Sequence, residues 1–194
     1  MPMRVVTALH PERRDRVRVD LDGAPWRTLP AAAVVAAGLR VGRGLDRPLV
    51  RELARALRRA AALEAAGRAL ARRDRSPAGL AALLERRGVA PAQGTEAVET
   101  LERLGYVDET RFAHARATSL AARGYGDEAI RFDLEREGAD ADAIEEAMAA
   151  LEPELERASA LVAAGGDRAR NARRLLAKGF SPEAVEAAAG TPDE

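Results

Sequence analysis

From about residue 46 onward, apolar residues recur every three or four positions, which is the spacing of amphipathic helices. The first run steps through Leu49, Leu53 and Leu57 and predicts a long or broken helix over 46–73. Later runs are shorter, and a glycine closes most of them, as expected where the backbone enters the left-handed region at a helix end. The pattern therefore predicts short helices joined by tight turns over most of the chain.

Three of these helical stretches repeat one another. When Gly88, Gly138 and Gly179 are superposed, a leucine falls four residues before each glycine. Repeated helical units of this size stack on their neighbours and present a long surface. We therefore predict a mainly α fold of three tandem three-helix, helix–turn–helix-like repeats in an elongated stack, with boundaries at 49–107, 108–152 and 153–194.

Capping residues mark the starts of the predicted helices. Ser76 and Ser181 each precede a proline, which combines an N-cap serine with a proline at the first helical position. Asp108, Asp140 and Asp167 are the N-cap candidates for three further helices. These signals agree with the apolar spacing about where the helices begin.

Residues 1–48 have a different pattern and are predicted to form a separate N-terminal module. The alternation in "RVRVDL" (Arg16–Leu21), followed by Asp22-Gly23, is a strong hairpin signal. The returning strand covers Trp26–Leu29, and a short helix follows over 30–37. "RVVTAL" (Arg4–Leu9) is a candidate third strand.

Composition narrows the class of protein. The chain has no cysteine, which excludes disulfides and thiolate metal sites. It also has no apolar run of the length a membrane span needs and no signal-peptide pattern. We expect a soluble, cytoplasmic protein with no cofactor and no metal.

The net charge of zero conceals a division along the chain. Residues 1–88 hold 19 arginines and nine acidic residues, a net of +10, whereas residues 89–194 carry a net of −10. Such asymmetry favours charged partners, although ordinary solvated helix faces would also account for it.

The sequence offers little for catalysis. Its two histidines, His10 and His114, have no evident catalytic partners and are interpreted as structural. The glycine-rich segments do not have the spacing of a phosphate-binding loop, and no ligand cluster for a metal is present. We therefore expect a binding protein and not an enzyme.

Arginine clusters near two helix ends are the first candidates for binding. They could contact nucleic-acid phosphates, although a cation at a helix C-terminus is also favoured by the helix dipole alone. The six aromatic residues are scattered and mostly interpreted as core, and Tyr125, between two glycines, is the one expected to be exposed. The candidates in this part of the chain are Arg72, Arg73, Arg75, Arg86 and Arg87.

The segment "LGYVDETRFAHARATSLAARGYGDEAIRFDLEREGADADAIEEAM" (Leu104–Met148) resembles the RecX family of RecA regulators in its Gly-Tyr-aliphatic-Asp, Arg-Phe-Ala and Arg-Gly-Tyr-Gly elements. "LARRDRSPAGLAALLERRGV" (Leu70–Val89) and "NARRLLAKGFSPEAV" (Asn171–Val185) resemble the flanking repeats, and the hairpin resembles an N-terminal extension of some members. The chain departs from the family pattern before the turn glycines, where lysine is usual and Arg87, Glu137 and Lys178 occur.

The resemblance implies a helical-repeat protein that lies in the groove of RecA filaments on single-stranded DNA. Family members limit filament extension and inhibit ATP hydrolysis, strand exchange and coprotease activity, and some bind DNA. The expected partners are therefore the RecA filament and single- or double-stranded DNA. Further candidates on or beside the central motif are Arg111, Arg123, Tyr125 and Arg131.

Two other functions stay open at the level of sequence. The helix pair around Gly88 could belong to a DNA-binding regulator, although the second helix begins with the acidic, donor-poor "AQGTEAVE". A helical scaffold for protein partners is the other alternative.

Overall fold

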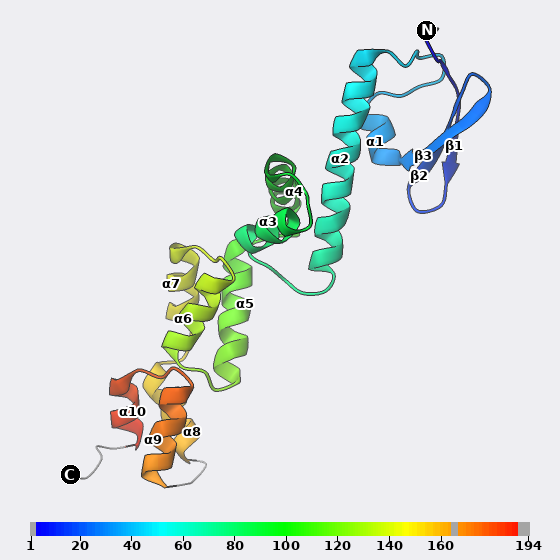
Figure 1. Cartoon of the computed structure of the whole chain (residues 1–194). Coiled ribbons are helices and arrows are strands. Elements are labelled where there is room, and N and C mark those ends of the chain that lie inside the picture. The colour runs from blue at the N-terminus through cyan, green and yellow to red at the C-terminus, as the bar shows by residue number, and fades with distance from the viewer. Residues whose placement is uncertain (1–2, 164–166, 190–194) are drawn as a thin grey trace. The chain divides into compact units, whose positions relative to one another are not determined.

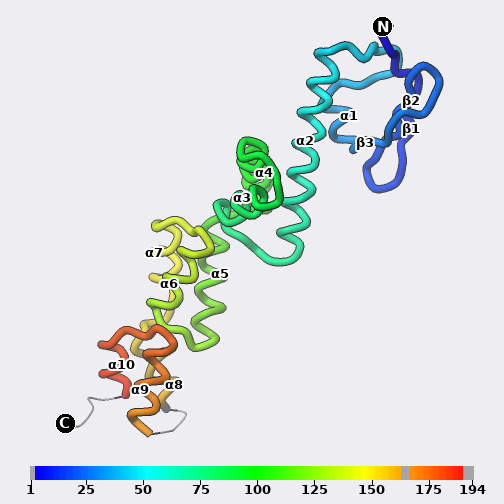
Figure 2. The backbone as a smooth tube through the Cα atoms, viewed as in Figure 1, coloured from blue at the N-terminus to red at the C-terminus, as the bar shows by residue number. Residues whose placement is uncertain are grey.

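A computed structural model of the chain describes residues 3–163 and 167–189, and it is mainly helical with one small sheet (Figures 1 and 2). In these ranges the strands are β1 (Val6–Glu12), β2 (Arg16–Leu21) and β3 (Ala24–Pro30). The helices are α1 (Ala31–Ala36), α2 (Arg47–Leu70), α3 (Pro77–Arg86), α4 (Pro91–Arg103), α5 (Glu109–Ala122), α6 (Asp127–Arg136), α7 (Ala141–Ala149), α8 (Glu154–Ala163), α9 (Arg168–Ala177) and α10 (Pro182–Ala189). The mainly α class with a small N-terminal β module is confirmed.

The chain forms two compact units. The first comprises Met1–Arg72 and Leu84–Thr100, and the second comprises Arg73–Leu83 and Leu101–Glu194, so that one boundary falls inside α3. Neither described part of the chain has a helix long and apolar enough to cross a membrane.

The N-terminal sheet is antiparallel in the order β1-β2-β3. Asp22 and Gly23, with φ of 51° and 83°, form the two-residue turn between β2 and β3, as the hairpin signal predicts. Pro25 pairs with Asp20 where the register shifts, and β3 lies at the sheet edge, a position that tolerates a missing N–H donor. The candidate third strand is present as β1.

Two helices pack against the sheet and share its hydrophobic core. Helices α1 and α2 pack beside it, and the shared core includes Val19, Leu21, Leu29, Leu49 and Leu53. Packing against helices is one of the ways in which so small a sheet becomes stable in water. The first turns of α2 therefore complete the core of the N-terminal module.

In the second unit, two sets of three helices each have their own core. Phe112, Leu120, Ile130, Leu134 and Ile144 lie in the core formed by α5, α6 and α7. A smaller core is formed by α8, α9 and α10, and its buried residues are Ala158, Leu175, Phe180 and Val185. The two sets follow one another in the ribbon, from green and yellow to orange and red (Figure 1).

The predicted helix ends are confirmed in detail. Gly88, Gly138 and Gly179 have φ of 82°, 82° and 76°, which is the left-handed conformation that glycine adopts most readily. The side chains of the three aspartates and two serines predicted as N-caps each accept a hydrogen bond from a backbone N–H of the following helix. These residues are Ser76, Asp108, Asp140, Asp167 and Ser181.

Candidate binding surface

Within the second unit, the start of α6 packs directly on the turn between α9 and α10. The Gly126 N–H donates to the Lys178 carbonyl at 2.9 Å, and the Glu128 N–H donates to the Gly179 carbonyl at 3.1 Å. A Cβ at Gly126 would overlap the backbone of Gly179 and Phe180. Gly126 is therefore required by the close approach of two backbones.

The same contact occurs once more in this unit, between the start of α3 and the turn between α6 and α7. The Ser76 hydroxyl donates to the Glu137 carbonyl at 2.5 Å, and a Cβ at Gly79 would lie 2.6 Å from that oxygen. In both places the N-cap residue donates to the carbonyl of the residue before the turn glycine. We call this arrangement the cap–turn junction.

The side chains at the two junctions carry different charges. Glu137 lies beside Arg73, with 3.0 Å between Arg73 Nη2 and Glu137 Oε2. This pairing gives a structural reason for the acidic residue at Glu137, where the family pattern has lysine. At the second junction the equivalent residue is Lys178, which sequence reasoning did not select.

Lys178 joins two of the predicted residues in a compact group, the cation–aromatic cluster of Arg123, Tyr125 and Lys178. The Lys178 ammonium lies 4.3 Å from the centre of the Tyr125 ring, and the Arg123 guanidinium carbon lies 5.3 Å from it. The Lys178 ammonium also donates to the Arg123 carbonyl at 3.3 Å. Two cations are thus held against one half-buried aromatic ring.

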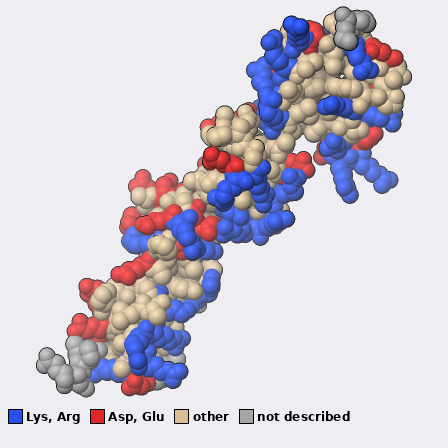
Figure 3. All heavy atoms as spheres, in the orientation of Figure 1, with Lys and Arg blue, Asp and Glu red and all other residues tan. Residues whose placement is uncertain are grey.

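Helix α9 extends this positive charge. Arg170, Arg174 and Lys178 follow one another at four-residue steps and so share one side of the helix. Arg170 and Arg174 are exposed. Figure 3 shows basic side chains gathered over this end of the second unit. Residues 89–194 are net negative, but this side of α9 is locally basic. We call the side formed by Arg170, Arg174 and Lys178 the α9 basic face.

The acidic residues of the second unit are concentrated on other helices. Helices α6 and α7 carry seven acidic side chains and two arginines. The acidic residues are Asp127, Glu128, Asp133, Glu135, Asp142, Glu145 and Glu146. These two helices are thus net acidic, whereas α9 carries four arginines and no acidic side chain.

Two other predicted residues make internal contacts. Arg111 Nη2 donates to the Gly105 carbonyl at 3.2 Å, and Arg111 Nη1 lies 3.9 Å from an Asp108 carboxylate oxygen. Arg131 forms a bidentate pair with Glu145, whose pKa is lowered by the hydrogen bond from that arginine. These contacts link α6 to α7 and stabilise the turn before α5.

Asp133 connects two further arginines. Burial alone would raise the pKa of Asp133, but the hydrogen bond from Arg116 at 2.6 Å and the charges of Arg116 and Arg136 lower it overall. The carboxylate is therefore charged in the folded chain. It balances part of the charge of Arg116 and Arg136.

The remaining predicted arginines are distributed over the two units. Arg72, Arg86 and Arg87 belong to the first unit, and all three are exposed. Arg73 and Arg75 belong to the second, where Arg75 is half-buried. Of the nine candidates, Arg123 and Tyr125 are the two that the cation–aromatic cluster brings into contact.

The expected exposure of aromatic residues is corrected in part. Tyr125 is half-buried and packs against the core of α5–α7, because the α9 end covers it. The more exposed aromatic residues are Tyr106 and Phe132, at 66% and 64% of their surface. Both histidines have carboxylate partners: His10 lies 3.0 Å from Asp20 and His114 lies 3.6 Å from Glu146.

Sequence reasoning also missed Arg157, which lies at the interface between the two helix sets of the second unit. Only 9% of its side chain is exposed. Its Nη1 donates to the Tyr125 carbonyl at 2.8 Å, its Nε donates to the Glu152 carbonyl at 3.0 Å, and its Nη2 pairs with Asp127. The side chain thus connects α8 to the loops before α6 and α8.

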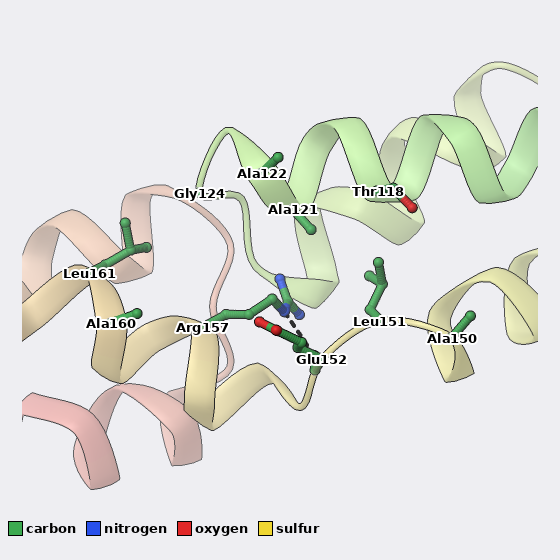
Figure 4. A pocket seen from close by; sticks show the side chains of 10 residues that line it. All are labelled: Thr118, Ala121, Ala122, Gly124, Ala150, Leu151, Glu152, Arg157, Ala160 and Leu161. Atoms are coloured by element: carbon green, nitrogen blue, oxygen red, sulfur yellow. Dashed lines mark hydrogen bonds between the residues drawn. The ribbon is translucent and has the colours of Figure 1, made fainter.

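An open cavity of about 500 Å³ lies next to Arg157 (Figure 4). Its wall is mostly apolar, with alanines of α5 and α8, and Leu151 and Leu161. Arg157 points along this wall toward Glu152, to whose carbonyl it is bonded. Because its three nitrogens already have partners, Arg157 serves to join helices at this place.

A glutamate begins each of the two helix sets, Glu109 in α5 and Glu154 in α8. Glu154 accepts hydrogen bonds from the Ser181 N–H at 3.2 Å and the Ser181 hydroxyl at 2.6 Å, and so holds the cap of α10. Burial and the negative charge of Asp140 raise the pKa of Glu109, and its Oε1 is buried without a hydrogen-bond partner among the described residues. Glu109 is therefore held in a place that disfavours its charge.

Glu109→Gln is expected to stabilise the fold at neutral pH, because glutamine has nearly the same size and carries no charge beside Asp140. A raised folded-state pKa means that the folded chain binds the Glu109 proton more tightly, so this group favours folding increasingly as the pH falls. The gain from the substitution should accordingly shrink as the pH falls from neutral toward the ordinary glutamate pKa, and it should be absent below about pH 4. Thermal unfolding of both proteins between pH 3.5 and 7.5 measures the difference in stability. A difference that does not change with pH would contradict the raised pKa of Glu109.

Comparison with known proteins places these features in a family. The description "RecX, second three-helix domain" matches residues 108–148. Regulatory protein RecX of Xanthomonas citri is 36% identical over 114 residues, 59% of this chain and 62% of that protein. The chain thus spans less than two thirds of the Xanthomonas relatives it matches.

A second relative matches over most of its length. Regulatory protein RecX of Halorhodospira halophila is 36% identical over 141 residues, covering 68% of this chain and 88% of that protein.

Solved structures agree on the fold. A crystal structure of regulatory protein RecX aligns with a TM-score of 0.79 at 19% identity, covering 95% of this chain and 98% of that one. RecX from Lactobacillus salivarius aligns with a TM-score of 0.58 at 17% identity, over 66% and 92%. At these identities the structures support the fold alone. With the 36% identity to the Halorhodospira protein and the matched three-helix domain, they show that this chain belongs to the RecX family.

Proposed function

We propose that this chain is a non-enzymatic regulator of the RecA recombinase. In this proposal it binds in the groove of the RecA filament on single-stranded DNA, limits filament extension, and inhibits ATP hydrolysis, strand exchange and coprotease activity. We further propose a cytoplasmic location and a role in the control of DNA repair. Membership of the RecX family supports the RecA partner, and the cation–aromatic cluster beside the α9 basic face supports a contact with the nucleoprotein.

The cluster is suited to a polyanionic target for a physical reason. Arg123 and Lys178 both contact the Tyr125 ring, and Lys178 also donates to the Arg123 carbonyl, which reduces the side-chain entropy lost when they bind phosphate. Arg170 and Arg174 continue the positive charge along α9, and the acidic residues lie on α6 and α7. We propose that α9 faces DNA and that α6 and α7 face basic protein surface.

ATP hydrolysis by the cognate RecA on single-stranded DNA is the direct test. A filament regulator is expected to inhibit hydrolysis at well below one molecule per RecA, because blocking one filament end affects many subunits. Inhibition only at an excess of this chain would indicate competition for DNA instead. No inhibition would contradict the RecA proposal and favour a helical DNA-binding or scaffold module in repair or transcription.

Replacing Arg174 and Lys178 together with glutamine is expected to weaken binding to single-stranded DNA and to reduce the log–log salt slope by about 1.4, since each lost phosphate contact removes about 0.7. The matched control is the pair Arg131→Gln and Arg136→Gln, which removes the same charge from side chains already paired with Glu145 and Asp133. Fluorescence anisotropy of a labelled oligonucleotide at several salt concentrations measures both variants. Equal slopes for the two double variants would exclude a specific role of α9.

A further inference from the structure

The turn at Arg87, Gly88 and Val89 is an uncovered copy of a surface that the second unit uses twice. A Cβ at Gly138 would lie 3.2 Å from the Ala78 methyl group, and a Cβ at Gly179 would lie 2.5 Å from the Ala129 methyl group. At Gly88, no atom of residues 3–163 or 167–189 lies within 4 Å of the same position, although its φ of 82° matches theirs. Arg86, Arg87 and Gly88 are all exposed, whereas the residues around Gly138 are half-buried.

The covered turns at Gly138 and Gly179 show which features a helix start needs to pack on such a turn. Each receives a helix N-terminus whose N-cap residue donates to the carbonyl before the glycine: Ser76 to Glu137 and Gly126 to Lys178. Three residues after the cap each helix has a very small side chain, because the turn lies against the helix there. These residues are Gly79 and Ala129.

The Glu137 turn also shows how opposite charges can be matched. Arg73 lies three residues before the Ser76 cap and pairs with Glu137, the residue before the turn glycine. At the Lys178 turn the equivalent pair is Arg123 and Lys178, whose like charges both lie against the Tyr125 ring. At the uncovered turn the equivalent residue is Arg87. An acidic residue three positions before the incoming cap would satisfy it in the same way.

A second copy of this chain fits poorly. Its equivalent helix start is the cap Asp167, but Arg170 stands three residues later, where Gly79 and Ala129 make close contact. A long cationic side chain there would meet the turn backbone and the charge of Arg87. Arg170 therefore prevents the start of α9 in a second copy from forming a cap–turn junction with the Gly88 turn.

We propose that the turn Arg87–Val89 binds the N-terminus of an α-helix of a different protein. This helix would carry Ser, Thr or another N-cap donor, Gly or Ala three residues later, and Asp or Glu three residues before the cap. The Arg87 carbonyl accepts the hydrogen bond of the cap, and the Arg87 side chain pairs with the acidic residue. The inference rests on the repeated junction and is independent of RecA binding.

The probe is a peptide of residues 73–86 with Arg73→Glu, extended by an alanine-rich helical tail, because shorter isolated helices are marginal in water. It is titrated to millimolar concentration into the ¹⁵N-labelled full chain. We expect amide shifts at residues 86–90, loss of binding with Gly79→Leu in the peptide, and about two- to fivefold weaker binding to the Arg87→Glu protein. The peptide with the native Arg73 should bind the Arg87→Glu protein more tightly than the native protein.

Each other result overturns the proposal. No shift, shifts centred on residues 137–139, or equal binding of the Gly79→Leu peptide would show that the Gly88 turn does not accept a helix start. Concentration-dependent shifts at residues 86–90 without peptide, with a matching mass increase in sedimentation, would identify a second copy as the occupant. An Arg86→Glu protein is the matched control, and it should bind the peptide more tightly than the Arg87→Glu protein does.

Discussion

Gly179→Ala is expected to lower the free energy of unfolding of the α8–α10 helices by about 3–5 kcal/mol, whereas Gly88→Ala should cost only about 1–2 kcal/mol. Both glycines have a left-handed backbone, with φ of 76° and 82°, so both substitutions incur the same conformational cost. Only at Gly179 would the new methyl group collide with Ala129, 2.5 Å away. The difference between the two variants therefore isolates the packing of the cap–turn junction.

Urea unfolding combined with amide hydrogen exchange measures the two effects separately, because a chain of several helix sets need not unfold in one step. Exchange in α9 and α10 should accelerate in Gly179→Ala and stay unchanged in Gly88→Ala. Gly67→Ala, inside α2 with open space around it, is a further control that should stabilise by about 0.5–1 kcal/mol. Equal losses at Gly179 and Gly88 would show that the junction has no packing energy of its own.

Arg157→Met is expected to destabilise the second unit by about 2–4 kcal/mol. Methionine retains the apolar part of the side chain but leaves Asp127 and the carbonyls of Tyr125 and Glu152 without their donor. The cost is below that of a fully buried pair because Asp127 is 37% exposed and can recruit water. The contact of the Arg157 guanidinium with the Phe180 ring, 5.8 Å from its centre, is lost as well.

Arg173→Met is the matched control for this prediction. Its side chain is exposed and bonds only to the Ala169 carbonyl of its own helix in the described contacts, so we expect a change within about 0.5 kcal/mol. The two proteins are compared by thermal unfolding followed by far-ultraviolet circular dichroism. Similar midpoints for Arg157→Met and Arg173→Met would contradict a joining role for Arg157.

The local features of the fold could be predicted from sequence because their signals lie within a few residues. A cap such as Asp108 and a turn glycine such as Gly138 act on adjacent backbone, so spacing alone identifies them. The Asp22-Gly23 hairpin is of the same kind. By contrast, Tyr125 was expected to be exposed, because nothing near it in sequence shows that Lys178 covers one side of its ring.

The residues that join helix sets were missed for a similar reason. Arg157 follows Glu154 and Glu156 at the charged start of α8, and a charged residue is usually solvated. One signal was available: aligning the starts of the last two repeats at Asp108 and Pro153 places Arg157 at the position of Phe112, which is buried. An arginine where a neighbouring repeat has a core residue indicates a buried guanidinium.

At each cap–turn junction the accepting atom belongs to the main chain, at Glu137 in one case and Lys178 in the other. This main-chain hydrogen bond does not depend on the charge of the side chain at that position, which is acidic and pairs with Arg73 in one case and is basic and contacts Tyr125 in the other. Successive units can thus diversify their outer electrostatics over evolutionary time while the spacing between them is inherited intact.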